Sequence, residues 1–340
     1  MDSCRGAIRC RVEATVVSEK VRRLLFSKRV RGEVLGVYRN SCNVKFDEAT
    51  IVNFGNEQVP LTPKSVRIPG GMLAAGIFPN IRAGDPVHAW GEFFLIPRAG
   101  VLVSCGRAAV YCAKPAQGCP PGEMSQIRKN LVEALSSTPG ARGIGTKESA
   151  SPLSGYFLSR LGFLLQGDGV PAEPREGRTH HGGLQARVRD SLRRRADDLL
   201  CSLRGVDWEK VRPAVKGLLG LGPGLTPSGD DFLAGLISAG VALSGHVEGI
   251  GDVVRGAVRI IGEESRRGTS CVSVSMLEDA ADGDMSEHAG AFLDSALRSR
   301  DANLVCRSAR RLFSVGASSG VDLANGLATG ILFFINPLLR

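Results

Sequence analysis

The 340-residue sequence contains few aromatic residues, only 5% of the chain, although its net charge is +9. A nucleic-acid platform usually combines a basic stripe with stacking aromatic side chains. Here the arginines are spread along the chain. The composition therefore predicts a generally basic surface, suited to an acidic partner or a small anionic substrate, and no nucleic-acid partner.

The sequence also lacks any Cys-x-x-Cys pair, although it contains nine cysteines. Their odd number and scattered positions indicate reduced thiols rather than a disulfide framework. Cys105, Cys112 and Cys119 fall seven residues apart, which leaves a metal site as a minor alternative, as do the adjacent His180 and His181. No metal-ligand set is predicted.

Long apolar runs are absent as well. The longest near the C-terminus, residues 330–339, is too short to cross a bilayer. The charged first residues contain no apolar run, so no signal peptide is expected. We expect a cytoplasmic protein without membrane contact, long enough for two domains.

The first part of the chain predicts a β-rich domain over residues 1–115. Short segments rich in valine, isoleucine and phenylalanine alternate with turn formers, a pattern typical of a small barrel or sandwich. A short helix is expected within Val12–Phe26. The predicted strands are Val30–Tyr38, Cys42–Phe46, Thr50–Phe54, Ser65–Ile68, Val87–Leu95 and Val101–Tyr111.

The rest of the chain predicts helices, which gives an α+β fold overall. Residues 116–183 form an expected linker region, with one helix at Met124–Ser136 and mobile loops at 137–155 and 167–183. Residues 184–340 form an expected α-helical domain. Its helices are predicted near 185–203, 211–219, 227–241, 250–264, 276–281, 286–298, 304–315 and 323–334.

One stretch of the helical part, Gly220–Ile237, combines a glycine-rich loop with a helix start. Gly222, Pro223 and Gly224 predict a tight turn, because none of them continues a regular element. Thr226 and Pro227 then fit an N-cap and a first helical position. Free N–H groups and the helix dipole at such a start favour an anion.

Two acidic residues, Asp230 and Asp231, complicate that interpretation because they would repel a phosphate. Either they only cap backbone amides, or a divalent cation such as Mg²⁺, or an ammonium or amide group of a substrate, offsets their charge. We favour a ligand site, because the preceding glycines, prolines and hydroxyls are denser than a turn requires.

Two further loops, 266–273 and 315–322, offer similar groups at helix starts, so we expect three N-termini to meet at one pocket. Arg266 or Arg267 would add positive charge. The candidate catalytic residues are Asp230 and Asp231. The candidate ligand-binding residues are Gly222, Gly224, Thr226, Ser228, Gly229, Thr269, Ser270, Ser273, Ser318, Ser319 and Asp322.

At these motifs the sequence resembles the AllH family, subunits of oxamate carbamoyltransferase. The run Gly220–Gly235 is similar to the family signature, and 269–283 and 316–322 match it in spacing. Ser270 stands where the family usually has threonine or asparagine, and it keeps the hydroxyl. The segment Ser41–Ile68 is similar to the family's β-rich start, so the resemblance covers most of the chain.

The resemblance implies a subunit that works with FdrA-type and AllG-type proteins in allantoin (purine) breakdown. Together they would exchange a carbamoyl group between oxamate and phosphate. The amides of 222–229 would bind phosphate or an oxyanion, and Ser318 and Ser319 a carboxylate. Asp230 or Asp231 would hold the carbamoyl NH₂ or a metal, and preorganised donors would supply most of the catalysis.

Two other functions stay open. The chain could be a non-catalytic scaffold subunit of such a complex, whose glycine loops only pack helices or contact a partner. It could also be a Mg²⁺-dependent phosphotransferase, although it lacks the Gly-x-x-x-x-Gly-Lys-[Ser/Thr] loop of many nucleotide-binding proteins.

Overall fold

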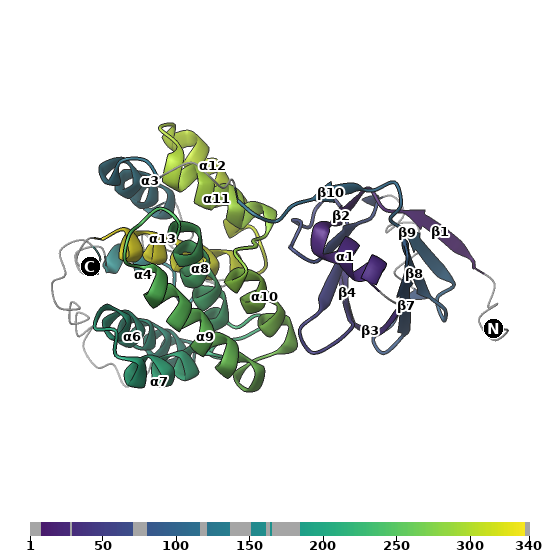
Figure 1. Ribbon diagram of the computed structural model, residues 1–340, viewed down its shortest axis with the longest axis horizontal. Coiled ribbons are helices and arrows are strands. Elements are labelled where there is room, and N and C mark those ends of the chain that lie inside the picture. Colours follow the sequence, from purple (N-terminus) through teal and green to yellow (C-terminus); the bar gives the residue numbers. More distant parts are fainter. Residues whose placement is uncertain are drawn as a thin grey trace. The chain divides into compact units, whose positions relative to one another are not determined.

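The computed structural model describes residues 8–27, 29–70, 80–115, 121–136, 151–160, 164 and 184–336. The chain divides into two compact units: Met1–Ala113 with Met285–Glu287, and Lys114–Asp284 with His288–Arg340. The first is β-rich and the second mostly helical, which confirms the predicted fold class (Figure 1).

The β-rich unit contains a ten-stranded sheet in the order β1-β9-β8-β7-β3-β4-β5-β6-β2-β10. A helix, α1 (Glu19–Ser27), follows the second strand. The strands are β1 (Cys10–Glu13), β2 (Val16–Ser18), β3 (Val30–Val37), β4 (Ser41–Lys45), β5 (Ile51–Gly55), β6 (Ser65–Arg67), β7 (Pro86–Trp90), β8 (Phe93–Ile96), β9 (Val101–Ser104) and β10 (Ala109–Tyr111).

This sheet curls round on itself. Only Ala14 and Thr15 separate β1 from β2, yet β1 is first in the strand order and β2 is next to last. Two residues span only about 7 Å, so the two ends of the sheet must come close together. Val44, Val52 and Phe94 point into the enclosed core. Of the two predicted architectures, the barrel-like one is therefore correct.

Two sequence predictions in this unit need correction, whereas the short helix expected within Val12–Phe26 is present as α1, after β1 and β2. The predicted strand Val87–Leu95 is a hairpin, β7 and β8, that turns at Gly91, whose φ of 58° favours glycine. Val101–Tyr111 likewise comprises two strands, β9 and β10.

The helical unit follows the predicted periodicity, with boundaries shifted by a few residues. No helix among the described residues is long and apolar enough to cross a membrane. The helices are α3 (Met124–Ser136), α4 (Tyr156–Ser159), α6 (Leu184–Arg204), α7 (Trp208–Leu218), α8 (Ser228–Leu243), α9 (Gly251–Gly268), α10 (Cys271–Ala281), α11 (Glu287–Arg298), α12 (Ala302–Phe313) and α13 (Ser319–Ile335).

Helices α8 and α13 form the centre of this unit and lie side by side (Figure 1). Nearly every residue of both is buried. A Cβ atom at Gly235 would lie 2.3 Å from the Leu323 carbonyl oxygen, and one at Gly326 would lie 2.3 Å from that of Phe232. Only glycine permits this approach, which brings the polar first turns of the two helices together.

Some predictions fall on other parts of the chain. The expected mobile loops at 137–155 and 167–183, with His180 and His181, lie outside the described residues, except for 151–155. Cys119 lies outside them as well. Cys105 is buried, and burial raises the pKa of its thiol to about 12, whereas Cys112 is exposed.

Candidate functional site

The segment 219–227, here called the glycine loop, has the sharp turns that its sequence predicts. Gly220, Gly222 and Gly224 have φ values of 71°, 125° and 102°, a region that favours glycine. The helix start differs by one position: Pro227, not Thr226, is the N-cap of α8. Pro227 accepts the N–H groups of the first turn through its carbonyl oxygen, so the Thr226 side chain is available for another contact.

The glycine loop presents unused backbone donors. Among the described residues, no acceptor bonds to the N–H groups of Gly222, Gly224, Leu225, Thr226 or Ser228. The remaining predicted donor is occupied, because the Gly229 N–H bonds to the Leu221 carbonyl at 3.0 Å. Residues 223–225 are exposed, so the loop is accessible from solvent.

Asp230 is fully buried, and the chain occupies both of its carboxylate oxygens. One accepts the Gly220 N–H at 2.9 Å and the other accepts the Thr269 hydroxyl. Burial raises the pKa of Asp230, while the bonds from Thr269, Gly220 and the nearby Ser273 lower it. Asp230 thus ties the glycine loop to the junction of α9 and α10.

At the start of α10, the polar side chains also bond to other groups of the chain. Ser270 caps the helix by accepting the Ser273 N–H at 3.1 Å, and its hydroxyl donates to the Leu225 carbonyl at 2.7 Å. The side chain of Arg266 is exposed and pairs with Glu278 at 3.5 Å, and Arg267 is exposed. The side chains of Ser270 and Arg266 are therefore already engaged within the chain.

Asp231, the next residue along the chain, has a different environment from that of Asp230. Burial raises the pKa of its carboxyl well above the usual value, and the charge of Asp322 raises it further. The hydroxyls of Ser319 and Thr226 lower the pKa and bond to each other at 2.9 Å. Both are half-buried, so this hydroxyl pair lies at the accessible edge of the buried acid.

Asp322, in the first turn of α13, completes this cluster. It accepts the Ser151 hydroxyl, and the Leu153 N–H lies 3.4 Å away. Burial raises its pKa to about 6, although the hydroxyls of Ser151, Ser228 and Ser318 act to lower it. Ser318 precedes α13 as its N-cap but makes no side-chain cap.

Sequence reasoning missed Ser151, which belongs to a short segment, 151–160, that packs on the central helices. The segment is held by a buried ion pair between Arg160 and Asp197 with N–O distances of 2.8 Å, and the Tyr156 hydroxyl bonds to the same carboxylate. No motif marks Ser151, because it lies at the end of a serine- and glycine-rich stretch that predicts only a loop.

The predicted site residues thus fall into two groups. Asp230, Thr269, Ser270 and Ser273 interact around the α10 start. Asp231, Asp322, Thr226, Ser228, Ser318 and Ser319 gather where α8 and α13 begin, next to Gly222 and Gly224. Within the described ranges, no three histidine, cysteine or acidic side chains are arranged to hold a metal ion.

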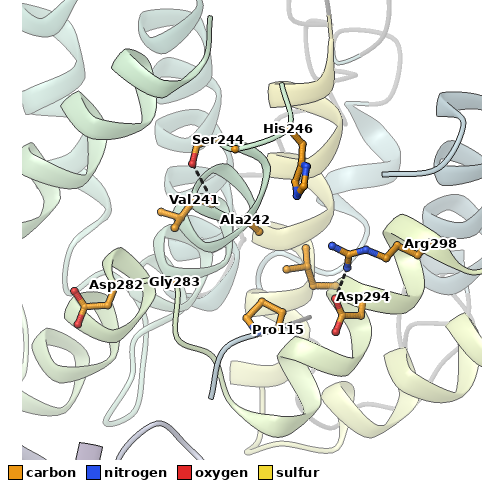
Figure 2. A pocket seen from close by; sticks show the side chains of 11 residues that line it. Pro115, Val241, Ala242, Ser244, His246, Asp282, Gly283, Asp294 and Arg298 are labelled. Atoms are coloured by element: carbon orange, nitrogen blue, oxygen red, sulfur yellow. Dashed lines mark hydrogen bonds and ion pairs between the residues drawn. The ribbon is translucent and has the colours of Figure 1, made fainter. Parts of the chain in front are cut away.

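A cavity of about 290 Å³ lies at the other end of α8 (Figure 2). Its lining includes Val241 and Ala242 near the end of α8, and His246 just after that helix. Asp294 and Arg298 of α11, which form an ion pair, also line it. Because α8 has 16 residues, this cavity is about 24 Å along the helix from the glycine loop. It contains none of the predicted site residues.

Comparison with protein families bears on the cluster at the α8 and α13 starts. Residues 218–331 match the family described as oxamate carbamoyltransferase subunit AllH. The resemblance to the AllH family is confirmed. The matched range includes the glycine loop and both central helix starts, and the family name supports a carbamoyltransferase-related subunit. No solved structure matches the chain.

Proposed function

We propose that this chain is a subunit of a carbamoyltransferase that exchanges a carbamoyl group between oxamate and phosphate, and that it binds the small anionic ligand at the glycine loop. One observation carries the proposal. The unbonded N–H groups of the loop lie next to the Thr226–Ser319 hydroxyl pair, at the start of two central helices.

The donors suit an anion such as phosphate, carbamoyl phosphate or oxamate. Backbone N–H groups and the positive ends of the α8 and α13 dipoles attract negative charge. Ser318 and Ser319 add hydroxyls for a carboxylate. Burial raises the pKa values of Asp231 and Asp322, so this pair carries less negative charge near neutral pH than two exposed carboxylates and repels an anion less.

In the forward reaction, a phosphate oxygen would attack the carbamoyl carbon of oxalurate. The carbonyl oxygen then becomes negatively charged, and the loop N–H groups would stabilise it. The bond from carbon to the oxamate nitrogen breaks, and that nitrogen takes the proton given up by hydrogen phosphate. The products are oxamate and carbamoyl phosphate. FdrA-type and AllG-type subunits would supply the remainder of the active complex in allantoin breakdown.

The test is the activity of the assembled complex, measured as carbamoyl phosphate formed from oxalurate and phosphate. Thr226→Val keeps the side-chain shape and removes the hydroxyl, and Ser319→Ala removes its partner. We expect each to lower kcat/KM by about tenfold or more, because each removes one hydroxyl that would bond to the charged ligand. Ser270→Ala, in the self-satisfied α10 start, serves as the matched control.

The opposite result would be wild-type activity in the Thr226→Val and Ser319→Ala complexes. The chain would then be a scaffold subunit, and its glycine loop would serve packing or partner contact. Binding of ATP with Mg²⁺ by the isolated chain, without a response to oxamate or carbamoyl phosphate, would instead support a phosphotransferase.

A further inference from the structure

Below the glycine loop lie side-chain oxygens that are buried and have no hydrogen-bond partner. They are Oγ of Ser228, Oδ2 of Asp231 and Oδ2 of Asp322. The exposed fractions of these residues are 0%, 2% and 0%. A buried polar atom without a partner costs free energy, and an uncompensated carboxylate costs most. A cluster of such atoms therefore indicates a missing partner.

These atoms belong to one place in the fold. The charge of Asp322 acts on Asp231 across the α8–α13 contact, and Ser228 lies beside Asp322. Ser228 also lies directly against the glycine loop, because a Cβ atom at Gly222 would be 3.1 Å from its Oγ. Residues 223–225 of the same loop are exposed to solvent.

The chemistry of the cluster selects its partner. Two carboxylates and a hydroxyl provide only oxygen ligands, which suit hard divalent cations. Where Mg²⁺ binds phosphate groups, it commonly uses one or two protein carboxylates, keeps several waters, and takes further oxygens from the ligand. A set of three acidic ligands, which the described residues do not provide, is therefore not required.

We propose that Asp231 and Asp322, with Ser228, hold one divalent cation of the Mg²⁺ type beneath the glycine loop. A dication balances the two carboxylates, and its positive charge faces the loop where an anion would bind. That the cation also contacts a bound anion rests on the proposed function, whereas the cation site itself is argued only from atoms of the chain. Asp230 is not a ligand, because Gly220 and Thr269 occupy its oxygens.

The test uses the isolated full-length chain and Mn²⁺ as the probe, with no anionic ligand present. Bound Mn²⁺ is measured as loss of the free-ion signal in electron paramagnetic resonance, and Mg²⁺ is added as competitor. We expect one site per chain that Mg²⁺ displaces. Asp231→Asn and Asp322→Asn should each weaken binding by at least about tenfold, since even changes outside the ligand set have such effects.

Asp230→Asn is the matched control, because it alters an equally buried aspartate on the adjacent position and should keep the Mn²⁺ site. Ser228→Ala, which retains both acids, should weaken binding without unfolding the chain, and circular dichroism checks the folding of each variant. No Mn²⁺ binding by the wild type, or equal binding by folded Asp231→Asn and Asp322→Asn, would overturn the proposal.

A phosphate titration with and without Mn²⁺ separates this inference from the proposed function. If Mn²⁺ binds at the acidic pair but phosphate, carbamoyl phosphate and oxamate do not bind, the cation site stands and the anion site fails. If the anions bind and Mn²⁺ does not, the anion site stands and the cation site fails.

Discussion

Two groups of helix starts in this protein differ, and the difference separates ordinary helix capping from a candidate ligand site. At α7, α10 and α12, the side chains of Asp207, Ser270 and Asp301 each accept a backbone N–H of the first turn. At α8 and α13 the N-cap positions, Pro227 and Ser318, make no such bond. The starts of α4 and α9 also lack a side-chain cap, so what distinguishes the two central starts is the buried acid in each first turn.

The two groups thus differ in burial. The capping Asp207 and Asp301 are exposed or half-buried and form salt bridges at the surface. The first-turn Asp231 and Asp322 of the central helices are buried, and the Oδ2 atom of each has no hydrogen-bond partner. A carboxyl group that only caps a helix gains nothing from such burial. The central starts therefore fit ligand binding better than helix initiation.

The largest expected effect comes from separating the two central helices. Gly326→Ala would place its Cβ atom 2.3 Å from the Phe232 carbonyl oxygen, so α13 must move away from α8. We expect a loss of about 3 kcal/mol or more in the free energy of unfolding. In contrast, Gly290→Ala in α11 meets no neighbouring atom and should stabilise by up to about 1 kcal/mol. Urea unfolding of both variants measures the difference.

The next effect concerns pH. The pKa of Asp322 is raised to about 6 from an ordinary value of 3.8, so the folded state binds the proton more tightly than the unfolded state. Stability should therefore fall as the pH rises from about 4 to about 6, by on the order of 3 kcal/mol from this residue. Asp322→Asn should flatten that slope in unfolding titrations with a chelator present. An unchanged slope would contradict the assigned environment.

A smaller loss is expected from Asp230→Ala. The substitution removes the acceptor of the Gly220 N–H and the Thr269 hydroxyl, and the loss of both bonds should cost about 2 kcal/mol. Asp301→Ala, the loss of an ordinary cap, should cost about 1 kcal/mol. Thermal unfolding of the two variants compares them, and equal losses would show that Asp230 acts as no more than a cap.

The smallest expected effect on stability is that of Ser270→Ala, about 1 kcal/mol from the lost α10 cap. This variant should keep the wild-type response to phosphate, because the Ser270 hydroxyl is engaged by Leu225. A lost phosphate response would place the α10 start in the ligand site and remove the distinction between the two groups of helix starts.

Hydrophobic periodicity and the positions of glycine and proline predicted most helices and the glycine loop, because these signals come from residues close together in the sequence. Which acidic residues lie together in the fold depends instead on residues far apart in the sequence. Asp230 and Asp231 are neighbours in sequence, but adjacent positions on a helix point in different directions. Asp231 instead faces Asp322, and only the glycine-mediated packing of α8 on α13 brings them together. The same limit applies to Ser151, and to the short strands β1 and β2.

The most direct test of the central claim is thermal unfolding of the isolated chain with phosphate, carbamoyl phosphate and oxamate, for the wild type and Thr226→Val. A ligand at 100 times its Kd stabilises the folded state by about 2.7 kcal/mol. We predict that at least one of these anions raises the wild-type midpoint and that Thr226→Val loses most of the rise. No rise with any anion, or an equal rise in Thr226→Val, would contradict a ligand site at the α8 and α13 starts.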